Sequence, residues 1–515
     1  METEQQKNKR IAKNTLYLYL RLAFSMLVAL YTSRVILNAL GVDDYGLYGV
    51  VGGVVVFFKV ISGSLNAAIS RFITFELGKG NVERLNKVFC TAVNIQILMS
   101  FLFFVVAEII GVWFLENKMN IPDGRMYAAH WVLQCSIFTF IVGLLSVPYN
   151  AAIIAHEHMG AFAYLGILST FLNLGVALVI PFVSADKLIF YALAILGINV
   201  LMRVIYGVYC TRHFSEAKWH FVKDKALMKE MTSFAGWNFI GASSGVLLGQ
   251  GVNILMNIFF GVAVNAARSI GNNVSSAIGK LVGNFTLALN PQITKSFASG
   301  DLHYMHDLVC KGAKYSFFIM LIPSLPILAE THQILVLWLK IVPDYAVVFT
   351  RMTIIISLLS VLSSTLITSM LASGNIKKYQ IIVGGLNMSI FPLAYVAFWL
   401  GLPPYSSYII QFIIYGIELG MRLILLKDMV SLPIRKYLKE VLARVVFVTI
   451  IATLIPGLMI INMNESIVRL FMVVFISFVC SFSSIYMLGI NSGERKWVNN
   501  KAKTIYCRLL SRDKR

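Results

Sequence analysis

Several long apolar segments of this sequence contain positively charged side chains. The five that we consider for substrate binding are Arg21, Arg34, Lys59, Arg268 and Lys280. A charged side chain inside a bilayer is costly, and such residues almost always face the protein interior, a water-filled cavity or a partner of opposite charge. Because all five are cations, they indicate a hydrated cavity that binds an anion.

Lys59 and Lys280 are the most informative of these cations. Each lies about 14 residues into its expected helix, roughly 21 Å along the axis, which is too deep for the amine to reach a head-group easily. Each also lies on a polar stripe at helical spacing. The stripe residues are Ser62 and Asn66 for the first lysine, and Asn273, Ser276 and Asn284 for the second. The alternative is a structural lysine that is bonded to backbone carbonyls.

The three arginines are weaker candidates for the cavity than the two lysines. Arg21 lies about seven residues into the first expected span, from which it can also extend to the cytoplasmic surface. Arg34 follows roughly 220° further around the same helix, so a straight helix cannot direct both side chains into one cavity. Arg34 and Arg268 lie near the outer ends of their spans, where extension to the membrane surface is an equal alternative.

A further set of amide side chains forms a candidate wall that could contact sugar hydroxyls. Its members are Gln250, Asn253, Asn257, Asn273 and Asn284. Amides in membrane helices also join neighbouring helices by hydrogen bonds, and we give both interpretations equal weight. Glu108 is the acid that we consider for coupling to a proton or a sodium ion. The six cysteines show no CxxC pairing, so we expect no metal site, and we identify no catalytic residue and no bound cofactor.

The composition shows which elements must position these residues. The 515-residue chain is 58% hydrophobic and only 13% charged, against about 25% charged residues in soluble domains. A span needs roughly 20 apolar residues, and the sequence predicts 14 such helices. They lie near 14–38, 45–70, 88–115, 128–154, 161–183, 188–211, 231–260, 266–292, 311–336, 347–373, 379–400, 407–426, 441–463 and 468–490.

The net charge of +20 has its origin in the loops. Lys and Arg concentrate on one side of this topology, which predicts that both termini are cytoplasmic. The predicted domains are a cytoplasmic segment 1–13, a six-helix bundle 14–211, a linker 212–230, a second six-helix bundle 231–426, two additional helices 427–490 and a basic tail 491–515.

An internal repeat relates the two bundles. Gly41-Val42 and Gly261-Val262 follow the first and seventh spans, and Ile73-Thr74 and Ile293-Thr294 end the second and eighth. Gly80-Asn81 and Gly300-Asp301 follow with the same offset, 300 − 80 = 220 residues. A constant offset at equivalent positions favours duplication, and transporters often place their substrate site between such halves.

These features together resemble a known family. The stretches LGVDDYGLYGVVGGV, SLNAAISRFITFELGKGN and GQGVNILMNIFFGVAVNAARSIGNNVSSAIGKLVGNFTLALNPQITKSFASGD resemble the bacterial polysaccharide transporter family. This family of lipid-linked oligosaccharide or O-antigen flippases belongs to the multidrug/oligosaccharidyl-lipid/polysaccharide exporter superfamily. The resemblance implies an all-α protein with a V-shaped pair of six-helix bundles, two extra C-terminal helices and alternating access. In related flippases basic residues of helices 1, 2 and 8 bind substrate, and Arg21, Lys59 and the Arg268/Lys280 region lie in the matching helices.

The expected function is therefore a flippase of the bacterial inner membrane rather than an enzyme. Its substrate would be an undecaprenyl pyrophosphate-linked oligosaccharide, moved from the cytoplasmic to the periplasmic leaflet for surface polysaccharide or lipopolysaccharide synthesis. The expected partners are this lipid, the bilayer and other polysaccharide assembly proteins, not nucleic acid. Two alternatives remain: a multidrug extrusion-type cation antiporter of the same fold, and an integral-membrane polysaccharide polymerase or ligase.

Overall fold

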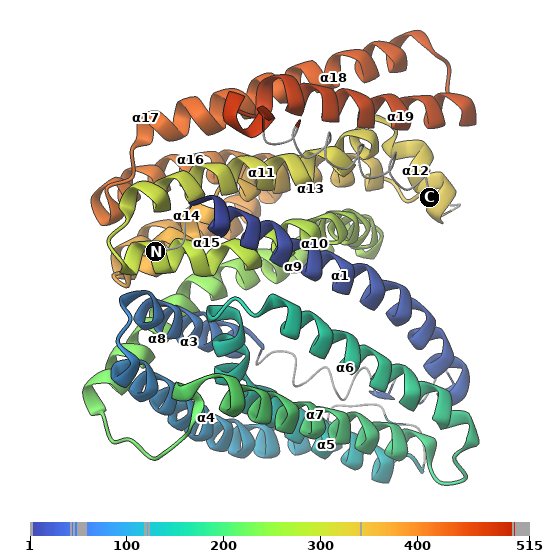
Figure 1. Cartoon of the computed structure of the whole chain (residues 1–515). Helices are drawn as coiled ribbons and strands as arrows, with labels where there is room; N and C mark the ends of the chain where they lie inside the picture. The colour runs from blue at the N-terminus through green and yellow to red at the C-terminus, as the bar shows by residue number, and fades with distance from the viewer. Residues whose placement is uncertain are drawn as a thin grey trace, which may run out of the picture. The chain divides into compact units, whose positions relative to one another are not determined.

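The computed structural model describes residues 4–41, 44, 47–48, 59–117, 121, 124–339, 342–496 and 499. Within these residues every regular element is a helix. The helices of the first part of the chain are α1 (Glu4–Leu40), α3 (Lys59–Lys79), α4 (Val82–Asn117), α5 (Met126–Ala155), α6 (Met159–Val179), α7 (Lys187–His213), α8 (Lys225–Val246) and α9 (Val252–Phe260) (Figure 1). They continue with α10 (Val262–Ala298), α11 (Leu302–Ala329), α12 (Thr331–Leu339), α13 (Ala346–Val361), α14 (Ser364–Ser373), α15 (Lys377–Trp399), α16 (Ser406–Val430), α17 (Ile434–Tyr437), α18 (Arg444–Asn462) and α19 (Ile467–Ser484).

Twelve helical segments among the described residues are long and apolar enough to cross a membrane. They follow one another in the order of the 14 expected spans and confirm an all-α, multi-pass membrane protein. The two expected spans that are missing from this set are 45–70 and 266–292. Residues 49–58 of the first lie outside the described residues, and α3 begins only at Lys59. The second lies within α10, which is long enough to cross a membrane but has a polar face.

The predicted repeat has a structural counterpart at the helix ends. Gly41 and Gly261 follow α1 and α9 with φ angles of 82° and 84°, and Gly80 and Gly300 follow α3 and α10 with 73° and 79°. Glycine adopts this left-handed conformation without steric cost and commonly ends helices in it.

The next helix begins in the same way in both halves. The Oδ1 atom of Asn81 accepts a hydrogen bond from Arg84 N at 3.0 Å, and that of Asp301 accepts one from Tyr304 N at 3.1 Å. Each is the N-cap arrangement that begins α4 or α11. The offset of 220 residues therefore preserves local geometry as well as sequence.

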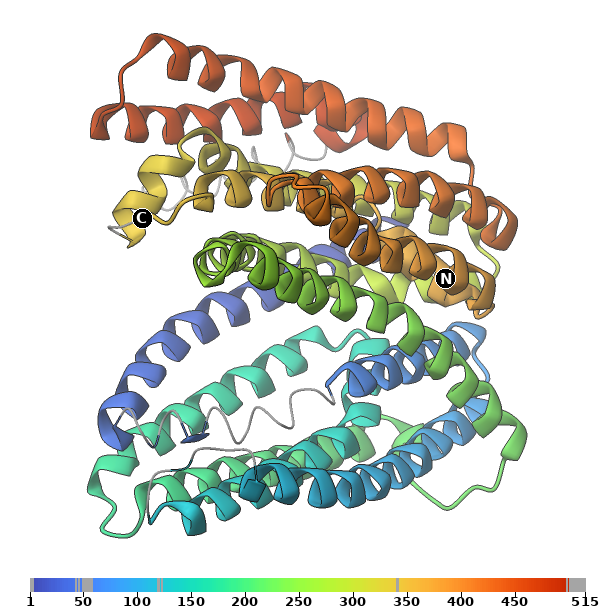
Figure 2. The ribbon, with the colours of Figure 1, turned by 180° about the vertical axis from the view of Figure 1, so that it is seen from behind.

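The helices are grouped into two compact units. The first comprises residues 1–244, 287–305 and 370–384. Inside it α5 packs against α4 and α7, and α1 packs along α6 (Figure 1 and Figure 2). The end of α3 lies very close to the end of α10, because a Cβ atom on Gly78 would lie 2.8 Å from the Cβ of Ala298.

The second unit comprises residues 245–286, 306–369 and 385–515. Its apolar core joins α9, α10, α13 and α16 around Met256, Phe349 and Tyr408. The two additional helices α18 and α19 lie side by side (Figure 1). Arg469 of α19 forms a buried ion pair with Glu330, with Nε and Oε1 2.8 Å apart, and this pair fixes α19 to the end of α11. Of the expected basic tail, residues 497, 498 and 500–515 lie outside the described residues.

Candidate functional site: the polar helix and the cationic side chains

The exposed face of α10 extends from Ser269 to Gly283 and is polar. Asn273, Ser276 and Lys280 are exposed, as the helical spacing predicted. Every exposed side chain among the described residues of α10 is polar or small: Ser269, Asn272, Asn273, Ser276, Ala277, Lys280 and Gly283. On α19, by contrast, exposed side chains such as Phe471 and Phe475 are large and apolar. Hydrocarbon would leave the amides and the ammonium group of α10 without hydrogen bonds, so this face suits water or a polar ligand.

Asn284 departs from the predicted stripe. It is buried, and its Nδ2 atom donates to the carbonyl oxygen of Lys280 at 3.1 Å. The amide therefore satisfies a backbone group of its own helix, whereas Lys280 itself stays exposed one turn earlier. Helical spacing placed Asn284 and Lys280 on one face. A step of four residues nevertheless turns Asn284 by about 40° around the helix axis relative to Lys280, and this turn brings Asn284 toward the core.

Arg268 is enclosed in the core of the second unit. Its Nη2 atom donates to Gly249 O at 3.5 Å, its Nη1 atom lies 3.8 Å from the sulfur of Met256, and its Cζ atom is 5.5 Å from the ring centre of Tyr408. Gly249 lies in the π-helical turn Leu247–Gly251 between α8 and α9. Such a turn opens the regular hydrogen-bond ladder, which makes this carbonyl available to the guanidinium. Arg268 lies six residues after the start of α10, near the helix end as expected, but it is buried and held by neutral groups.

The two arginines of α1 lie in different surroundings, as their angular separation predicted. Arg21 is partly buried, with its Cζ atom 4.5 Å from the ring centre of Phe162 on α6. A Cβ atom on Gly166 would lie 2.7 Å from the Cδ of Arg21, so the absence of a side chain there makes room for the arginine. Arg34 is exposed. Lys59 begins α3, but its side chain lies outside the described residues.

The candidate sugar-contacting wall is only partly exposed. Gln250 and Asn257 are exposed and Asn253 is intermediate. Gln250 belongs to the π-helical turn, and Asn257 lies in the last turn of α9, before the capping residue Gly261. These amides therefore remain candidates for ligand contact, whereas Asn284 has an internal partner.

Glu108 lies in the first unit, between α4 and α5. Its Oε2 atom accepts a hydrogen bond from Gln134 Nε2 at 2.9 Å, and its Oε1 atom is buried without a hydrogen-bond partner among the described residues. A buried carboxylate oxygen without a hydrogen-bond donor is costly unless a ligand or water supplies the missing partner. This geometry is compatible with the coupling role that the sequence predicted for Glu108.

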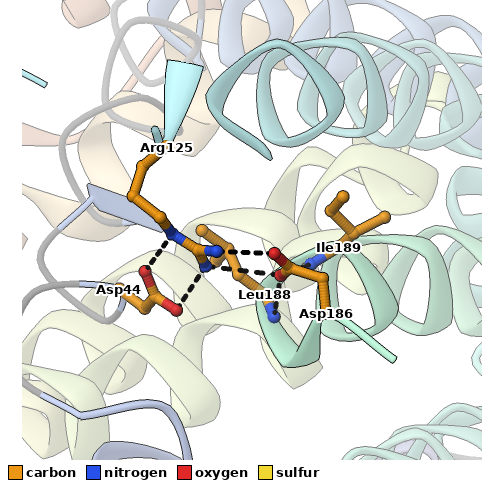
Figure 3. Close-up of polar contacts among 5 residues, drawn as sticks. All are labelled: Asp44, Arg125, Asp186, Leu188 and Ile189. Atoms are coloured by element: carbon orange, nitrogen blue, oxygen red, sulfur yellow. Dashed lines mark hydrogen bonds and ion pairs between the residues drawn. The ribbon is translucent and has the colours of Figure 1, made fainter. Parts of the chain in front are cut away.

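Sequence reasoning missed an ionic cluster that joins three connections of the first unit (Figure 3). Arg125, at the start of α5, bonds to both carboxylate oxygens of Asp44 and to both of Asp186. Asp186 also caps α7 by accepting from Leu188 N at 3.0 Å. The predicted topology places these three connections on one side of the membrane, and that shared side is the signal that could have revealed the cluster.

The charges of this cluster stabilise one another. The hydrogen bond to Asp186 is the largest cause that raises the pKa of Arg125. Burial alone would raise the pKa of Asp186, but the hydrogen bond from Arg125 and the amides at the start of α7 lower it overall. Both groups therefore remain charged near neutral pH and act as a clamp between the ends of α5 and α7.

A second missed cluster surrounds the buried carboxylate of Glu157, in the turn between α5 and α6. Its oxygens lie 2.8 Å from Arg10 Nε, 2.7 Å from Lys295 Nζ and 2.6 Å from Gln292 Nε2. Its carbonyl oxygen accepts from Asn14 Nδ2 at 3.3 Å. The carboxylate thus ties the start of α1 to the end of α10, within the first unit. The turn has no sequence signal for this role, because these partners lie far away in the chain, Gln292 by 135 residues and Asn14 by 143.

Comparison with known proteins identifies the family. The family model described as "Polysaccharide biosynthesis protein" matches residues 11–297, more than half of the chain. The chain belongs to this polysaccharide biosynthesis protein family. The membrane protein EpsK of Bacillus subtilis (strain 168) is a relative with 20% identity over 321 residues. That match spans 61% of this chain and 62% of EpsK, so the chain spans less than two thirds of its relative.

Solved structures show the same fold at low identity. A crystal structure of MATE in the straight conformation matches with a TM-score of 0.69 and 13% identity, over 82% of this chain and 96% of that chain. A MOP superfamily transporter from Pyrococcus furiosus Vc1 (DSM3638) matches with a TM-score of 0.69, 10% identity and the same coverage. This member of the polysaccharide biosynthesis protein family is thus a multi-pass membrane protein that shares the fold of these solved structures.

Proposed function

We propose that this family member is a flippase. It moves an oligosaccharide linked to undecaprenyl pyrophosphate from the cytoplasmic to the periplasmic leaflet of the bacterial inner membrane by alternating access. The observation that carries the proposal is the exposed polar face of α10, which contains Lys280 near its C-terminal end. A membrane helix needs such a face where a hydrated, charged cargo passes, and a positive group there matches a pyrophosphate.

The energetics explain why this cargo needs cations. Burying an isolated anion in hydrocarbon costs tens of kcal/mol in the idealised limit, and a hydrated basic surface replaces the lost solvation. The prenyl tail is apolar and can remain in the lipid while the head-group moves. An interior-negative membrane potential favours export by about 2.3 kcal/mol per negative charge per 100 mV. Coupling to a proton or sodium ion through Glu108 would add to this force.

The fold neighbours are compatible with differences in cargo charge. The MOP superfamily transporter from Pyrococcus furiosus has a binding pocket of reverse polarity, which suggests a different function for that protein. Pocket charge therefore differs between proteins of this fold. The cations of α1 and α10 favour an anionic cargo here over the organic cations of a multidrug extruder.

The test is transport of a fluorescent lipid pyrophosphate-linked oligosaccharide in vesicles that contain the purified full-length protein. We expect the wild type to move the lipid between leaflets and Lys280→Gln to slow it at least tenfold, with partial recovery in Lys280→Arg. The matched control is Lys427→Gln, which removes an exposed lysine at the end of α16. Transport of an organic cation, but of no lipid-linked sugar, would refute the proposed function.

A further inference from the structure

The connection between α7 and α8, residues 214–224, lies along the start of α4 (Figure 1). Two asparagines of α4 bind its backbone. The Nδ2 atom of Asn86 donates to Glu216 O at 2.9 Å, and that of Asn94 donates to Val222 O at 3.0 Å. The two amides are about two helical turns apart, so they lie on the same side of α4. They therefore fix the connection to α4 near both of its ends.

The two aromatic rings of this connection are exposed. Trp219 and Phe221 are 48% and 68% exposed. His220 between them contacts α4, because its backbone N and its Nδ1 atom each lie 3.5 Å from the sulfur of Cys90. The backbone enters this stretch with extended angles, and residues two apart in an extended chain share a side. The Nε1 atom of Trp219 donates to Asn94 Oδ1 at 3.2 Å, so its polar atom is satisfied and its ring suits an apolar neighbour.

Trp219 is bound at the edge of the apolar surface of α4. The exposed side chains that precede Asn94 on this helix include the charged Glu83, Arg84 and Lys87. Those that follow it are large and apolar: Ile97, Leu98 and Phe101 are 46%, 54% and 68% exposed. The 36 residues of α4 extend about 54 Å, against about 30 Å for the hydrocarbon core of a bilayer. The start of α4 therefore extends into the head-group region, and Trp219 lies near the boundary with the hydrocarbon.

The same connection and the start of α8 have an excess of positive charge. The segment 218–230 contains two acids, Asp224 and Glu230, against four exposed lysines, which are Lys218, Lys223, Lys225 and Lys229. Asp224 caps α8 by accepting from Leu227 N at 2.9 Å. None of the four lysines lies within 4.0 Å of a carboxylate oxygen among the residues that the structure describes. These cations are therefore available to an anionic surface.

We propose that the segment 218–225 binds anionic phospholipids of the surrounding bilayer. Trp219 and Phe221 lie at the level of the glycerol groups, as an apolar continuation of the lipid-facing side of α4, and the lysines contact the phosphates. Aromatic rings are enriched at this depth of a membrane, and basic segments beside a span attract anionic lipids. The predicted topology places this segment at the cytoplasmic leaflet. The proposal concerns a different helix from α10 and does not depend on the flippase function.

The first experiment measures the depth of Trp219 in the full-length protein, in nanodiscs of phosphatidylcholine with brominated acyl chains. The chain has seven tryptophans, so the contribution of Trp219 is the difference between the wild type and Trp219→Phe. We expect brominated lipid to remove at least half of this contribution and acrylamide in the water to remove less. The double variant Trp219→Phe/Phe221→Trp moves the fluorophore by two residues and should give the same result.

The second experiment measures lipid charge preference with the same signal. Brominated phosphatidylglycerol, diluted in unlabelled phosphatidylcholine, should quench Trp219 at least twofold more than brominated phosphatidylcholine at the same mole fraction. The triple variant Lys218→Gln/Lys223→Gln/Lys225→Gln should lose this preference and keep the quenching by phosphatidylcholine. The matched control removes three exposed lysines from other segments and should keep the preference: Lys427→Gln/Lys439→Gln/Lys496→Gln. Thermal denaturation of each variant verifies that it is folded.

Three results would overturn the proposal. Trp219 that is quenched by acrylamide but not by brominated lipid would lie in water, where a soluble partner could bind it instead. Equal quenching by the two brominated lipids in the wild type would show no recognition of the anionic head-group. Equal loss of preference in the control variant would show an effect of net charge rather than of this segment.

Discussion

The carboxylate of Asp186 has two structural tasks at one position. It accepts hydrogen bonds from the first amides of α7 and pairs with Arg125, which itself also binds Asp44. Both tasks need the ionised form, because a protonated carboxyl group loses charge and acceptor capacity. The stability of this end of the first unit should therefore depend on pH.

The pH prediction follows from the direction of the pKa shift. The pKa of Asp186 is lowered from its usual value of 3.8 in the folded protein. Its ionised form thus stabilises the fold above that value, and this contribution disappears as pH falls below 3.8 toward the folded pKa. We expect the thermal midpoint of the wild type to fall more between pH 6 and pH 3 than that of Asp186→Asn. Parallel slopes for the two proteins would contradict the prediction.

Individual side chains were predictable where helical spacing decides their position. Asn273, Ser276 and Lys280 are exposed because one face of one helix contains them. The partner of Arg268 could not be predicted, since Gly249 O becomes available only through a π-helical turn. Glu157 was equally hidden, because Lys295 lies 138 residues away in the sequence.

The helix α10 shows how an element can be long enough to span a membrane and still lack the apolar content of a span. Its exposed face has no large apolar side chain among the described residues, whereas its buried face includes Val264, Ile278 and Val282. A helix of this kind inserts stably only if neighbouring helices cover one side and water or ligand covers the other.

A substitution on this face separates insertion from transport. Ser276→Leu makes α10 more apolar, so we expect membrane insertion and abundance to stay at the wild-type level or rise. Lipid-linked oligosaccharide transport should fall at least fivefold, because the leucine removes water and polar contacts beside Lys280. The matched control is Thr453→Leu, the same kind of change at an exposed position of α18, which should transport normally. Equal transport by both variants would show that the polar face of α10 has no role.

Helix order and the duplication were predictable because local signals determine them. The glycines after α1, α3, α9 and α10, together with Asn81 and Asp301, mark helix ends and starts in the sequence itself. The short helix α12 and the π-helical turns were not expected. Their sequences share no pattern that marks them, since the π-helical turn Leu247–Gly251 contains a glutamine and Leu438–Ala443 contains a lysine and a glutamate. Only the surrounding tertiary structure distinguishes these elements.

At the scale of the whole chain, the boundaries of the two sequence repeats differ from those of the two compact units. Duplication predicts a first bundle that ends at residue 211 and a second that begins at 231. The first compact unit also includes 287–305 and 370–384. Specific contacts explain this inclusion: Lys295 and Gln292 bind Glu157, and Arg71 donates to Ala372 O at 3.3 Å.

Glu157 should therefore be important for the stability of the first unit. Glu157→Gln leaves Arg10 and Lys295 without this carboxylate. Because both cations are partly exposed, we expect a loss of stability below the value of about 3–5 kcal/mol for a fully buried ion pair. We expect a lower thermal midpoint in detergent and faster proteolysis near the end of α10. Glu83→Gln is the control, because its ion pair with Lys87 is exposed and solvent screens such pairs, so its loss should change stability little. A loss no larger than that of the control would contradict the assigned role.

The π-helical turn Leu247–Gly251 makes the two repeated segments locally different. The segment Lys225–Phe260 corresponds to α1 by the 220-residue offset, yet α1 is uninterrupted. A π turn accommodates about one additional residue, which rotates the preceding side chains by about 100° relative to a continuous helix. Aligned positions before the turn, such as Arg21 and Gly241, therefore lie on different faces of their helices. A ligand designed for one face of α1 should accordingly fail to fit the aligned face of the segment before this turn.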